Sequence, residues 1–285
     1  MTSMTKSQHG FTLIEAVIVI VITGAISAVV AMFIQAPIKG YFDSARRAEL
    51  TDVADTALRR MSRDLHVALP NSIRTSGSTT SAAIEFLQTS SGGRYRSEFG
   101  TTTADDFLDF TQSDSSFELL GPPMNFAAFD MEHQNQIVIY NLGIPGASAY
   151  TGGTTTGDNR RAYNVLTGGA TTSIQITPNA PFPFDSPNHS FHVVDTPVSY
   201  ICDFVAGTLT RYSGYAIPPI QPTPPTGALR TALLAQNVSA CAFTYLSGAP
   251  SGVTERSSLV AIRLSLRQSS ETATLYHEVH VTNVP

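Results

Sequence analysis

The sequence lacks an excess of positive charge, since 17 Lys and Arg residues face 22 Asp and Glu residues, for a formal net charge of −5. A protein that binds nucleic acid through bulk positive charge has the opposite balance, so we expect no nucleic-acid partner. Tryptophan is also absent, whereas Ser, Thr, Gly and Pro are abundant. This composition is typical of a loop-rich exported β domain, and the length of 285 residues allows one or two domains.

The short motifs of common enzyme classes are missing as well. The sequence contains no G-x-S-x-G, no P-loop and no G-x-G-x-x-G. The segment His277-Glu278-Val279-His280 is one residue short of H-E-x-x-H, and on a strand its two histidines point to opposite faces. This spacing excludes a zincin site. We therefore expect no catalytic residue, no cofactor and no enzymatic activity.

Two groups of side chains could be drawn around a metal ion. The first group consists of Asp185, His189, His192 and Asp195. The second group consists of Asp105, Asp106, Asp109 and Asp114. Carboxylates suit Ca²⁺, but EF-hand spacing is absent, and proline-rich loops collect His and Asp by chance. A solvated loop is the preferred interpretation of both groups, although calcium binding at 105–114 stays open.

The sequence does have one long apolar run near its start. From Phe11 to Ile34 the only formally charged residue is Glu15, and fourteen residues are Leu, Ile, Val or Phe. About 24 residues at a rise of ~1.5 Å span ~36 Å, enough to cross a hydrocarbon layer of ~30 Å. The run tolerates one glutamate, which costs about 2.5–3.5 kcal/mol at the membrane centre. An intramembrane carboxylate is a functional-site hypothesis by default, and this run has no cation to pair with it unless the chain is cut just upstream.

The residues around this carboxylate form a motif. Gly10-Phe11-Thr12-Leu13-Ile14-Glu15, after a short polar leader and before the apolar run, resembles the type IV prepilin (class III) signal. The resemblance implies that a prepilin peptidase cleaves between Gly10 and Phe11 and then N-methylates Phe11. It also implies that Glu15 neutralises the Phe11 amine of a neighbouring subunit during filament assembly. A secretory signal is the alternative, but its apolar core is shorter, at about 7–15 residues, and its cleavage site follows the core.

The leader also predicts the orientation in the membrane. Residues 1–10 carry Lys6 and the initiator amine without an acid, so the positive-inside rule keeps them in the cytoplasm. We expect a single pass through the inner membrane, a periplasmic C-terminal domain, and later a place in a cell-surface pilus. The resemblance implies prepilin peptidase, other pilin subunits and the pilus assembly machinery as partners.

The pattern after Pro37, where we expect a kink, predicts an amphipathic helix that ends at Leu69 before Pro70. Its apolar stripe consists of Ile38, Tyr41, Phe42, Ala45, Leu50, Val53, Ala54, Ala57, Leu58, Met61, Leu65 and Leu69. Asp55 with Arg59, and Arg60 with Asp64, have the i,i+4 spacing of ion pairs. The arginine-rich side could bind DNA or lipid, but the interleaved acids favour a solvated or subunit-facing side.

The rest of the chain reads as strands and loops. We expect strands at 83–88, 136–142, 173–177, 191–204, 208–212, 259–267 and 274–281. We expect loops at 75–82, 92–116, 143–161 and 217–227, the last one proline-rich. The fold class is therefore α+β, with a long N-terminal helix packed on an antiparallel sheet. The expected segments are a leader (1–10), a transmembrane helix (11–36), an amphipathic helix (37–70) and a β-rich pilin domain (71–285).

Later segments extend the resemblance. The segments 61–65, 68–74, 197–202 and 209–212 are similar to the O-type minor pilin of the mannose-sensitive haemagglutinin (MSHA) pilus. This similarity implies a minor pilin that takes part in the biogenesis and assembly of an MSHA-like type IV pilus. Two alternatives stay open: a pseudopilin of a type II secretion system, and a membrane-anchored adhesin or ligand-binding protein.

The only two cysteines, Cys202 and Cys241, follow the predicted membrane segment. Disulfides form and persist outside the inner membrane, and both cysteines lie in apolar, strand-like surroundings. We therefore predict a disulfide between them, with two unpaired buried cysteines as the alternative. A closed loop of about 40 residues gives roughly 4 kcal/mol of stabilisation on the chain-entropy model.

Overall fold

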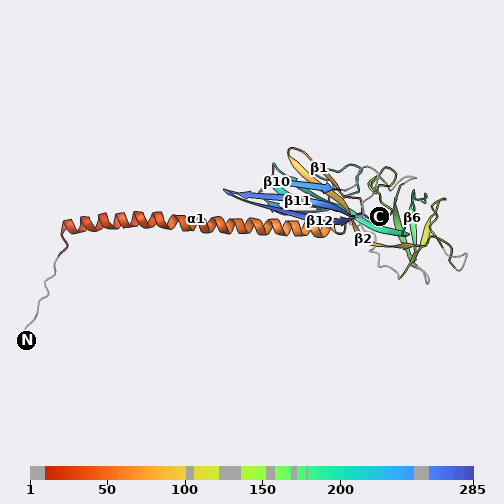
Figure 1. The fold of residues 1–285 in the computed structure, drawn as a ribbon, viewed down its shortest axis with the longest axis horizontal. Helices are drawn as coiled ribbons and strands as arrows, with labels where there is room; N and C mark the ends of the chain where they lie inside the picture. Colours follow the sequence, from red (N-terminus) through yellow and green to blue (C-terminus); the bar gives the residue numbers. More distant parts are fainter. Residues whose placement is uncertain are drawn as a thin grey trace, which may run out of the picture. The chain divides into compact units, whose positions relative to one another are not determined.

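The computed structural model describes residues 10–100, 106–121, 136–151, 158–167, 172–177, 179–246 and 257–285. Within these residues the chain forms one α-helix and twelve β-strands, drawn in Figure 1. It divides into two compact units, Met1–Glu49 and Leu50–Pro285. The predicted α+β class is confirmed: a long apolar helix precedes a large antiparallel β domain.

Helix α1 (Leu13–Leu65) is continuous through Pro37 and contains 53 residues. It ends four residues before the predicted end at Leu69. The N–H groups of Val67 and Ala68 bond to carbonyls three residues back, at 3.3 and 3.2 Å, which tightens the last turn. The Leu69 N–H then donates to the Leu87 carbonyl at 2.7 Å. Contact with the sheet, rather than Pro70, therefore ends the helix.

The second unit contains the last four turns of the helix and buries their apolar side. Its buried residues follow three- and four-residue steps, as the sequence predicts: Leu50, Ala54, Ala57, Leu58, Met61 and Leu65. Burying a side chain of the size of Leu or Met stabilises the fold by roughly 1.5–3 kcal/mol. The start of the predicted stripe differs, because Ile38, Tyr41 and Phe42 are exposed in the first unit.

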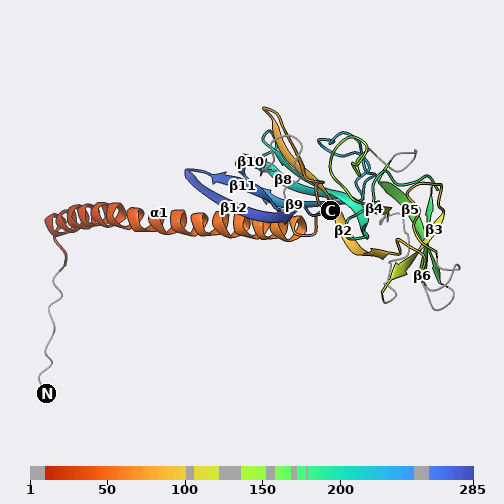
Figure 2. The ribbon, with the colours of Figure 1, turned by 45° about the vertical axis from the view of Figure 1, so that its right-hand side comes forward.

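The strands form two antiparallel sheets, where the sequence had suggested one. The strands of the larger sheet are β1 (Arg74–Gly77), β2 (Ser81–Tyr95), β3 (Ser116–Leu120), β4 (Gln136–Ile139), β5 (Arg160–Thr167), β6 (Thr172–Thr177), β7 (Ser190–Asp203), β8 (Thr208–Ser213) and β9 (Arg230–Gln236). The smaller sheet contains β10 (Val238–Leu246), β11 (Ser257–Gln268) and β12 (Glu271–Thr282). Strands β10 to β12 lie alongside the end of the helix (Figures 1 and 2).

The larger sheet closes partly on itself. Its strand order is β1-β2-β3-β6-β5-β4-β7-β8-β9, and β2 also pairs with β7, so six of these strands form a closed ring. Aromatic and branched side chains fill the ring, among them Tyr95, Phe117, Ile137, Ile174 and Phe191. Figure 2 shows β3 to β6 at the far end of β2.

Strands β2 and β7 belong to both parts of this sheet. Their pairing is irregular between Leu87 and Ser91, and beyond that point both strands contribute to the ring. We predicted a loop from Gly92, which is wrong for Gly92–Tyr95, since these residues continue β2. A Cβ atom at Gly92 would lie 3.0 Å from the Phe191 carbonyl oxygen, a tighter contact than most Cβ atoms make, so the close strand pairing favours a glycine there.

The chain changes sheets between β9 and β10 at a single residue. Asn237 separates the two strands and has φ 61°, a left-handed conformation that Asn tolerates better than most residues. Strand β11 then carries the predicted alternation: Val260, Ile262, Leu264 and Leu266 are all fully buried, in one core with the helix. The strands expected at 191–204 and 208–212 are present as β7 and β8 and form a hairpin, with Cys202 opposite Leu209.

Candidate functional site

The N-terminal segment places Gly10, Phe11 and Glu15 at the head of the helix. Among the described residues, no atom beyond the chain neighbours of Gly10 would contact a side chain at this position, and Phe11 is 78% exposed, so the peptide bond between them is accessible. Thr12 caps the helix, because its carbonyl accepts from the Ala16 N–H at 3.2 Å. Its hydroxyl also accepts from the Glu15 N–H at 3.4 Å. The sequence Thr-x-x-Glu is that of a capping box, so Glu15 suits the positive end of the helix dipole as well.

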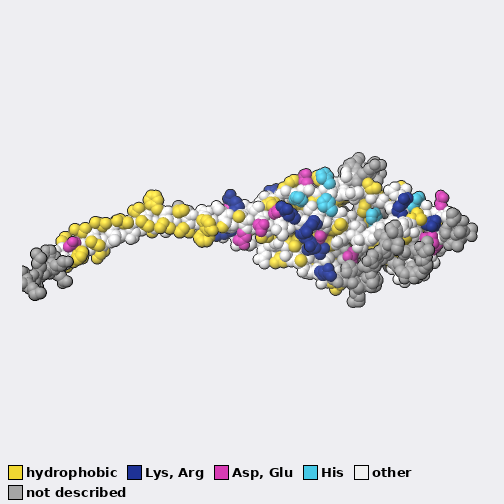
Figure 3. Space-filling model, turned by 90° about the horizontal axis from the view of Figure 1, so that it is seen from below, with side chains coloured by type: hydrophobic (Ala, Val, Ile, Leu, Met, Phe, Trp, Pro, Cys, Tyr) yellow, Lys and Arg dark blue, Asp and Glu magenta, His cyan; other side chains and the backbone are white. Residues whose placement is uncertain are grey.

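The helix that follows has an apolar surface on all sides. Every side chain described between Leu13 and Gln35 is exposed, although most of them are apolar. Figure 3 shows apolar side chains over most of the visible face of this segment. A helix that is apolar all round needs lipid or other helices around it. Among the described residues, α1 is the one helix long and apolar enough to cross a membrane.

The same segment also matches a known family. Residues 5–31 carry the prokaryotic N-terminal methylation motif. This motif is type IV pilin-like, so the resemblance seen in the sequence is confirmed at that level. It points to a structural, membrane-anchored pilin-type protein rather than an enzyme, and it implies processing by prepilin peptidase. No curated protein and no solved structure matches the chain.

The β domain contains the disulfide expected from its two cysteines. Cys202 on β7 is bonded to Cys241 on β10, with their Cα atoms 6.3 Å apart. Cys202 is fully buried in the core beneath the helix. The bond joins the larger sheet to the smaller one, which the sequence alone did not indicate.

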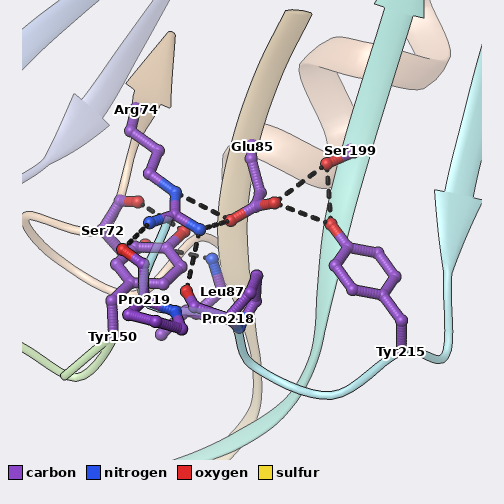
Figure 4. Close-up of polar contacts among 9 residues, drawn as sticks. All are labelled: Ser72, Arg74, Glu85, Leu87, Tyr150, Ser199, Tyr215, Pro218 and Pro219. Carbon is purple, nitrogen blue, oxygen red and sulfur yellow. Dashed lines mark hydrogen bonds and ion pairs between the residues drawn. The ribbon is translucent and has the colours of Figure 1, made fainter. Parts of the chain in front are cut away.

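A buried ion pair organises the sheet face that points away from the helix. Glu85 on β2 is fully buried, and Arg74 on β1 bonds to its Oε1 from Nε at 2.8 Å and also from Nη2 (Figure 4). The other carboxylate oxygen accepts from the hydroxyls of Tyr215 at 3.0 Å and Ser199 at 3.2 Å. The Arg74 guanidinium lies 3.7 Å from the centre of the Tyr150 ring. We refer to these five residues as the Arg74–Glu85 cluster.

The Arg74–Glu85 cluster also holds the proline-rich connector at 217–227. Arg74 donates from Nη2 to the Pro218 carbonyl at 3.0 Å and from Nη1 to the Pro219 carbonyl at 2.9 Å (Figure 4). Burial raises the pKa of Glu85, and the positive charge of Arg74 only partly offsets this shift. In the sequence, the signal for this pair is a lone acid within the apolar strand Ala82–Leu87.

A second ion-pair group fastens the helix to the sheet. The predicted pair of Arg60 with Asp64 is present at 3.3 Å, but Asp64 also accepts from Arg211 Nε at 2.7 Å and from the Tyr200 hydroxyl at 2.7 Å. Burial, together with the nearby Asp64 carboxylate, raises the pKa of Tyr200. Asp64, which the sequence pattern places on a solvated helix face, therefore links α1 to β7 and β8 through hydrogen bonds.

The remaining helix arginines support a solvated face. Arg59 lies 2.6 Å from Asp55, as predicted, and Arg46 lies 3.1 Å from Asp43. Figure 3 shows basic and acidic side chains interleaved on the visible face. This interleaving disfavours a strip that binds DNA through positive charge.

Asparagine side chains connect the turn after the helix to both sheets. Asn71 donates to the Asn141 carbonyl at 2.9 Å and to the Asn283 carbonyl at 3.3 Å. Asn141 in turn donates to the Pro70 carbonyl at 2.6 Å, and Asn283 donates to the Tyr245 hydroxyl at 3.0 Å. These bonds satisfy the backbone of a buried turn, as a buried segment requires.

The described members of the two groups of possible metal ligands do not converge. Asp185 accepts from the Tyr95 hydroxyl and lies 3.4 Å from His189 Nδ1, while burial lowers the pKa of His192 on β7. Asp109 and Asp114 accept hydrogen bonds from the backbone of their own loop, and Asp105 lies outside the described residues. Among the residues that the structure describes, no three His, Cys, Asp or Glu side chains could hold a metal ion.

The segment His277–His280, which is one residue short of the zincin motif, lies on β12. His277 is half-buried, whereas His280 is exposed and three positions later, so the two rings are on opposite faces. Tyr276 donates to Glu278 at 2.6 Å on the exposed face. These residues belong to β12, an edge strand of the smaller sheet.

Proposed function

We propose that this protein is a minor pilin of an MSHA-like type IV pilus. It enters the inner membrane with its β domain in the periplasm, loses residues 1–10, and is N-methylated on Phe11. The mature chain then joins or primes the filament. The observation that carries this proposal is the methylation motif at 5–31, which extends from the polar leader into a helix whose first half is apolar on every side.

A helix that is apolar on every side suits a protein that functions by assembling into a filament. In the membrane, lipid covers its apolar surface, and in a filament the helices of neighbouring subunits take the place of lipid. An unpaired carboxylate in either environment is costly. The Phe11 amine of the next subunit removes this cost by pairing with Glu15, so the pairing favours a fixed stagger between adjacent helices.

The helix surface beyond the membrane-length segment supports packing against other subunits. Leu13 to Ile34 already span ~33 Å at a rise of ~1.5 Å per residue. Tyr41 is 72% exposed and Phe42 is 57% exposed, both about two turns after Ile34. Aromatic side chains of this size add apolar area that a neighbouring helix would bury.

A pseudopilin of a type II secretion system is the second candidate, because the same motif and the same helix suit it. The two candidates differ in the filament that contains the subunit. Sheared surface pili from the native host should contain the mature chain if it is a minor pilin. Recovery only from cells with an active type II secretion system, and not from pili, would favour the pseudopilin.

The experiment combines fractionation with mass spectrometry. Pili are sheared from cells with and without an active prepilin peptidase, and the chain is detected by immunoblotting. We expect the chain in the pilus fraction only when the peptidase is active, with N-methyl-Phe11 as its first residue. A mature chain that begins at Met1, or beyond Ile34, would end this proposal.

A further inference from the structure

A pocket of about 300 Å³ lies on the β domain, on the sheet face that points away from the helix. Its floor is made by alternate residues of β7 and β8: Ile201 and Asp203, and Thr208, Thr210 and Tyr212. The residues between them, Cys202 and Leu209, point into the core beneath the helix. The pocket therefore stays clear of the surface that packs on α1.

The walls of the pocket come from two loops. Thr80 and Ser81, at the start of β2, form one side, and Thr223 and Pro224 of the proline-rich connector form the other. Ser81 pairs with Asp203 across the sheet, and Asp203 pairs with Thr208. Three adjacent strands thus present one row of short polar side chains to the pocket.

Local hydrogen bonds hold these polar groups in place. Asp203 Oδ1 accepts from the N–H groups of Val205 and Ala206 at 2.8 and 2.9 Å. The Ser78 hydroxyl lies 3.1 Å from both the Thr80 and Ser81 hydroxyls. The Phe204 N–H donates to the Thr80 carbonyl at 2.9 Å, which joins the turn before β2 to the turn between β7 and β8. The connector is fixed by the bonds of Arg74 to Pro218 and Pro219 described above.

Other hydroxyls in the pocket remain available. Within the described part of the chain, the side-chain hydroxyls of Thr208, Thr210, Tyr212 and Thr223 make no hydrogen bond to another protein group. Each can both donate and accept. The Tyr212 ring, Ile201 and Pro224 add apolar surface beside them.

The charge of the lining residues restricts the chemical classes of ligand that the pocket can bind. Among the residues that the structure describes, the lining contains one carboxylate, Asp203, and no Lys or Arg, so these residues disfavour phosphate, sulfate and carboxylate groups. Alternating hydroxyls and apolar patches match a molecule that has hydroxyl groups at its edge and C–H groups on its faces. A volume of about 300 Å³ is at the small end of ligand sites, which range over about 300–1,000 Å³.

We propose that this pocket binds a neutral mono- or disaccharide unit. Asp203 accepts hydrogen bonds from ligand hydroxyls, the hydroxyls of Thr208 and Thr210 donate and accept at its edge, and the Tyr212 ring lies against a C–H face. The site gives the exported domain a binding activity that is separate from helix assembly.

Direct titration of the mature full-length chain tests this proposal. The chain is held in lipid nanodiscs, since glycoside detergents would compete for the pocket. The probes are glucose, galactose, mannose, N-acetylglucosamine and lactose, followed by saturation-transfer NMR and calorimetry. We expect at least one neutral probe to bind with one site per chain, and glucuronate to bind more weakly than glucose because of the Asp203 charge.

Matched variants locate the binding. Thr210→Val keeps the side-chain shape but removes one hydroxyl, and should weaken binding about three- to tenfold. Tyr212→Ala should weaken it by about tenfold. The controls Thr272→Val and Tyr276→Ala change exposed residues on β12, in the other sheet, and should leave binding unchanged.

Three outcomes would overturn the proposal. One is that no neutral saccharide binds, and another is that glucuronate binds as tightly as glucose. The third is that Thr210→Val and Tyr212→Ala bind as the unaltered chain does, which would place any binding elsewhere. Circular dichroism of each variant verifies that the domain is folded.

Discussion

Glu15 has two possible roles that a pair of substitutions can separate. Its backbone N–H donates to the Thr12 hydroxyl, and the Glu side chain of such a capping box can accept from the backbone N–H of the capping residue. We propose that the same carboxylate also pairs with the Phe11 amine of a neighbour. Glu15→Ala removes both roles, whereas Glu15→Gln keeps an amide that can cap the helix but removes the charge. We expect both variants to insert into the membrane normally and both to be depleted from sheared pili, measured by quantitative immunoblotting.

The Gln variant decides between the two roles. If Glu15→Gln enters pili at the level of the unaltered chain while Glu15→Ala does not, helix capping is the essential role. Normal incorporation of both variants would mean that this subunit makes no such contact, for example at a filament tip.

Gly10 is the second residue with a direct test. We propose that the peptidase must approach the chain closely at this junction, and Gly10 has no side chain to obstruct it. Gly10→Val should therefore leave an uncleaved chain in the membrane, which mass spectrometry detects as ten additional residues. Gly40→Val, another exposed glycine of the same unit, is the control and should be cleaved normally. Cleavage of the Gly10→Val chain at the same bond would contradict the prediction.

Arg74 is a residue whose loss should depend on pH. Arg74→Met leaves the Glu85 carboxylate buried without a cation, and removing one partner of a buried pair typically costs about 3–5 kcal/mol. We expect about 2–4 kcal/mol at pH 7, because 21% of the Arg74 side chain is exposed. Chemical denaturation followed by circular dichroism measures this loss.

The sign of the pH dependence follows from Glu85. Burial raises its pKa above the ordinary value of 4.5, and loss of Arg74 raises it further. A raised acid pKa favours folding when the group is protonated, below the ordinary value, and this advantage disappears as pH rises through the folded-state value. The Arg74→Met defect should therefore be smaller at pH 4 than at pH 7. The double variant with Glu85→Gln should lose this difference, and an equal defect at both pH values would contradict the account.

At the scale of elements, the disulfide joins β7 of the larger sheet to β10 of the smaller one. A sequence separation of 39 residues gives roughly 4 kcal/mol on the chain-entropy model. Cys202→Ser should lower the free energy of unfolding by about this amount, because the proline-rich connector regains its freedom in the unfolded chain. Cleavage at Gly10 should not change, since it depends on another part of the chain.

Thiol labelling provides the control for that prediction. The denatured, unreduced protein should show no reactive thiol, and reduction should reveal two. Cys241→Ser should lower stability as much as Cys202→Ser does, and the double variant should add little. Two reactive thiols before reduction would refute the bond.

At the scale of the whole molecule, the two compact units differ in how far their apolar side chains are buried. The core clusters contain described residues from Leu50 onward, while Leu13 to Ile34 are exposed. A chain of residues 38–285 should therefore stay in solution without detergent and unfold within about 2 °C of the full-length protein. Thermal unfolding by circular dichroism and sedimentation measure this. A large drop in the midpoint would mean that the first unit stabilises the second.

Local patterns in the sequence determined much of this protein. The apolar run after Phe11 and the alternation of Val260 to Leu266 depend on neighbours in the chain, and each predicts its element by periodicity alone. The two cysteines predicted their bond because they have no other partner in the sequence. The α+β class follows from one long helix before many strands.

Only the tertiary structure decided how these elements join. The ring closed by β2 and β7, the change of sheet at Asn237, and the early helix end at Leu65 depend on strand registers between residues far apart in the chain. The Arg74–Glu85 cluster and the pocket above Thr210 depend on a connector whose prolines predict only that it is not a strand. Periodicity reports which face of an element is apolar, but not which other element covers it, because that choice is made by packing across the whole domain.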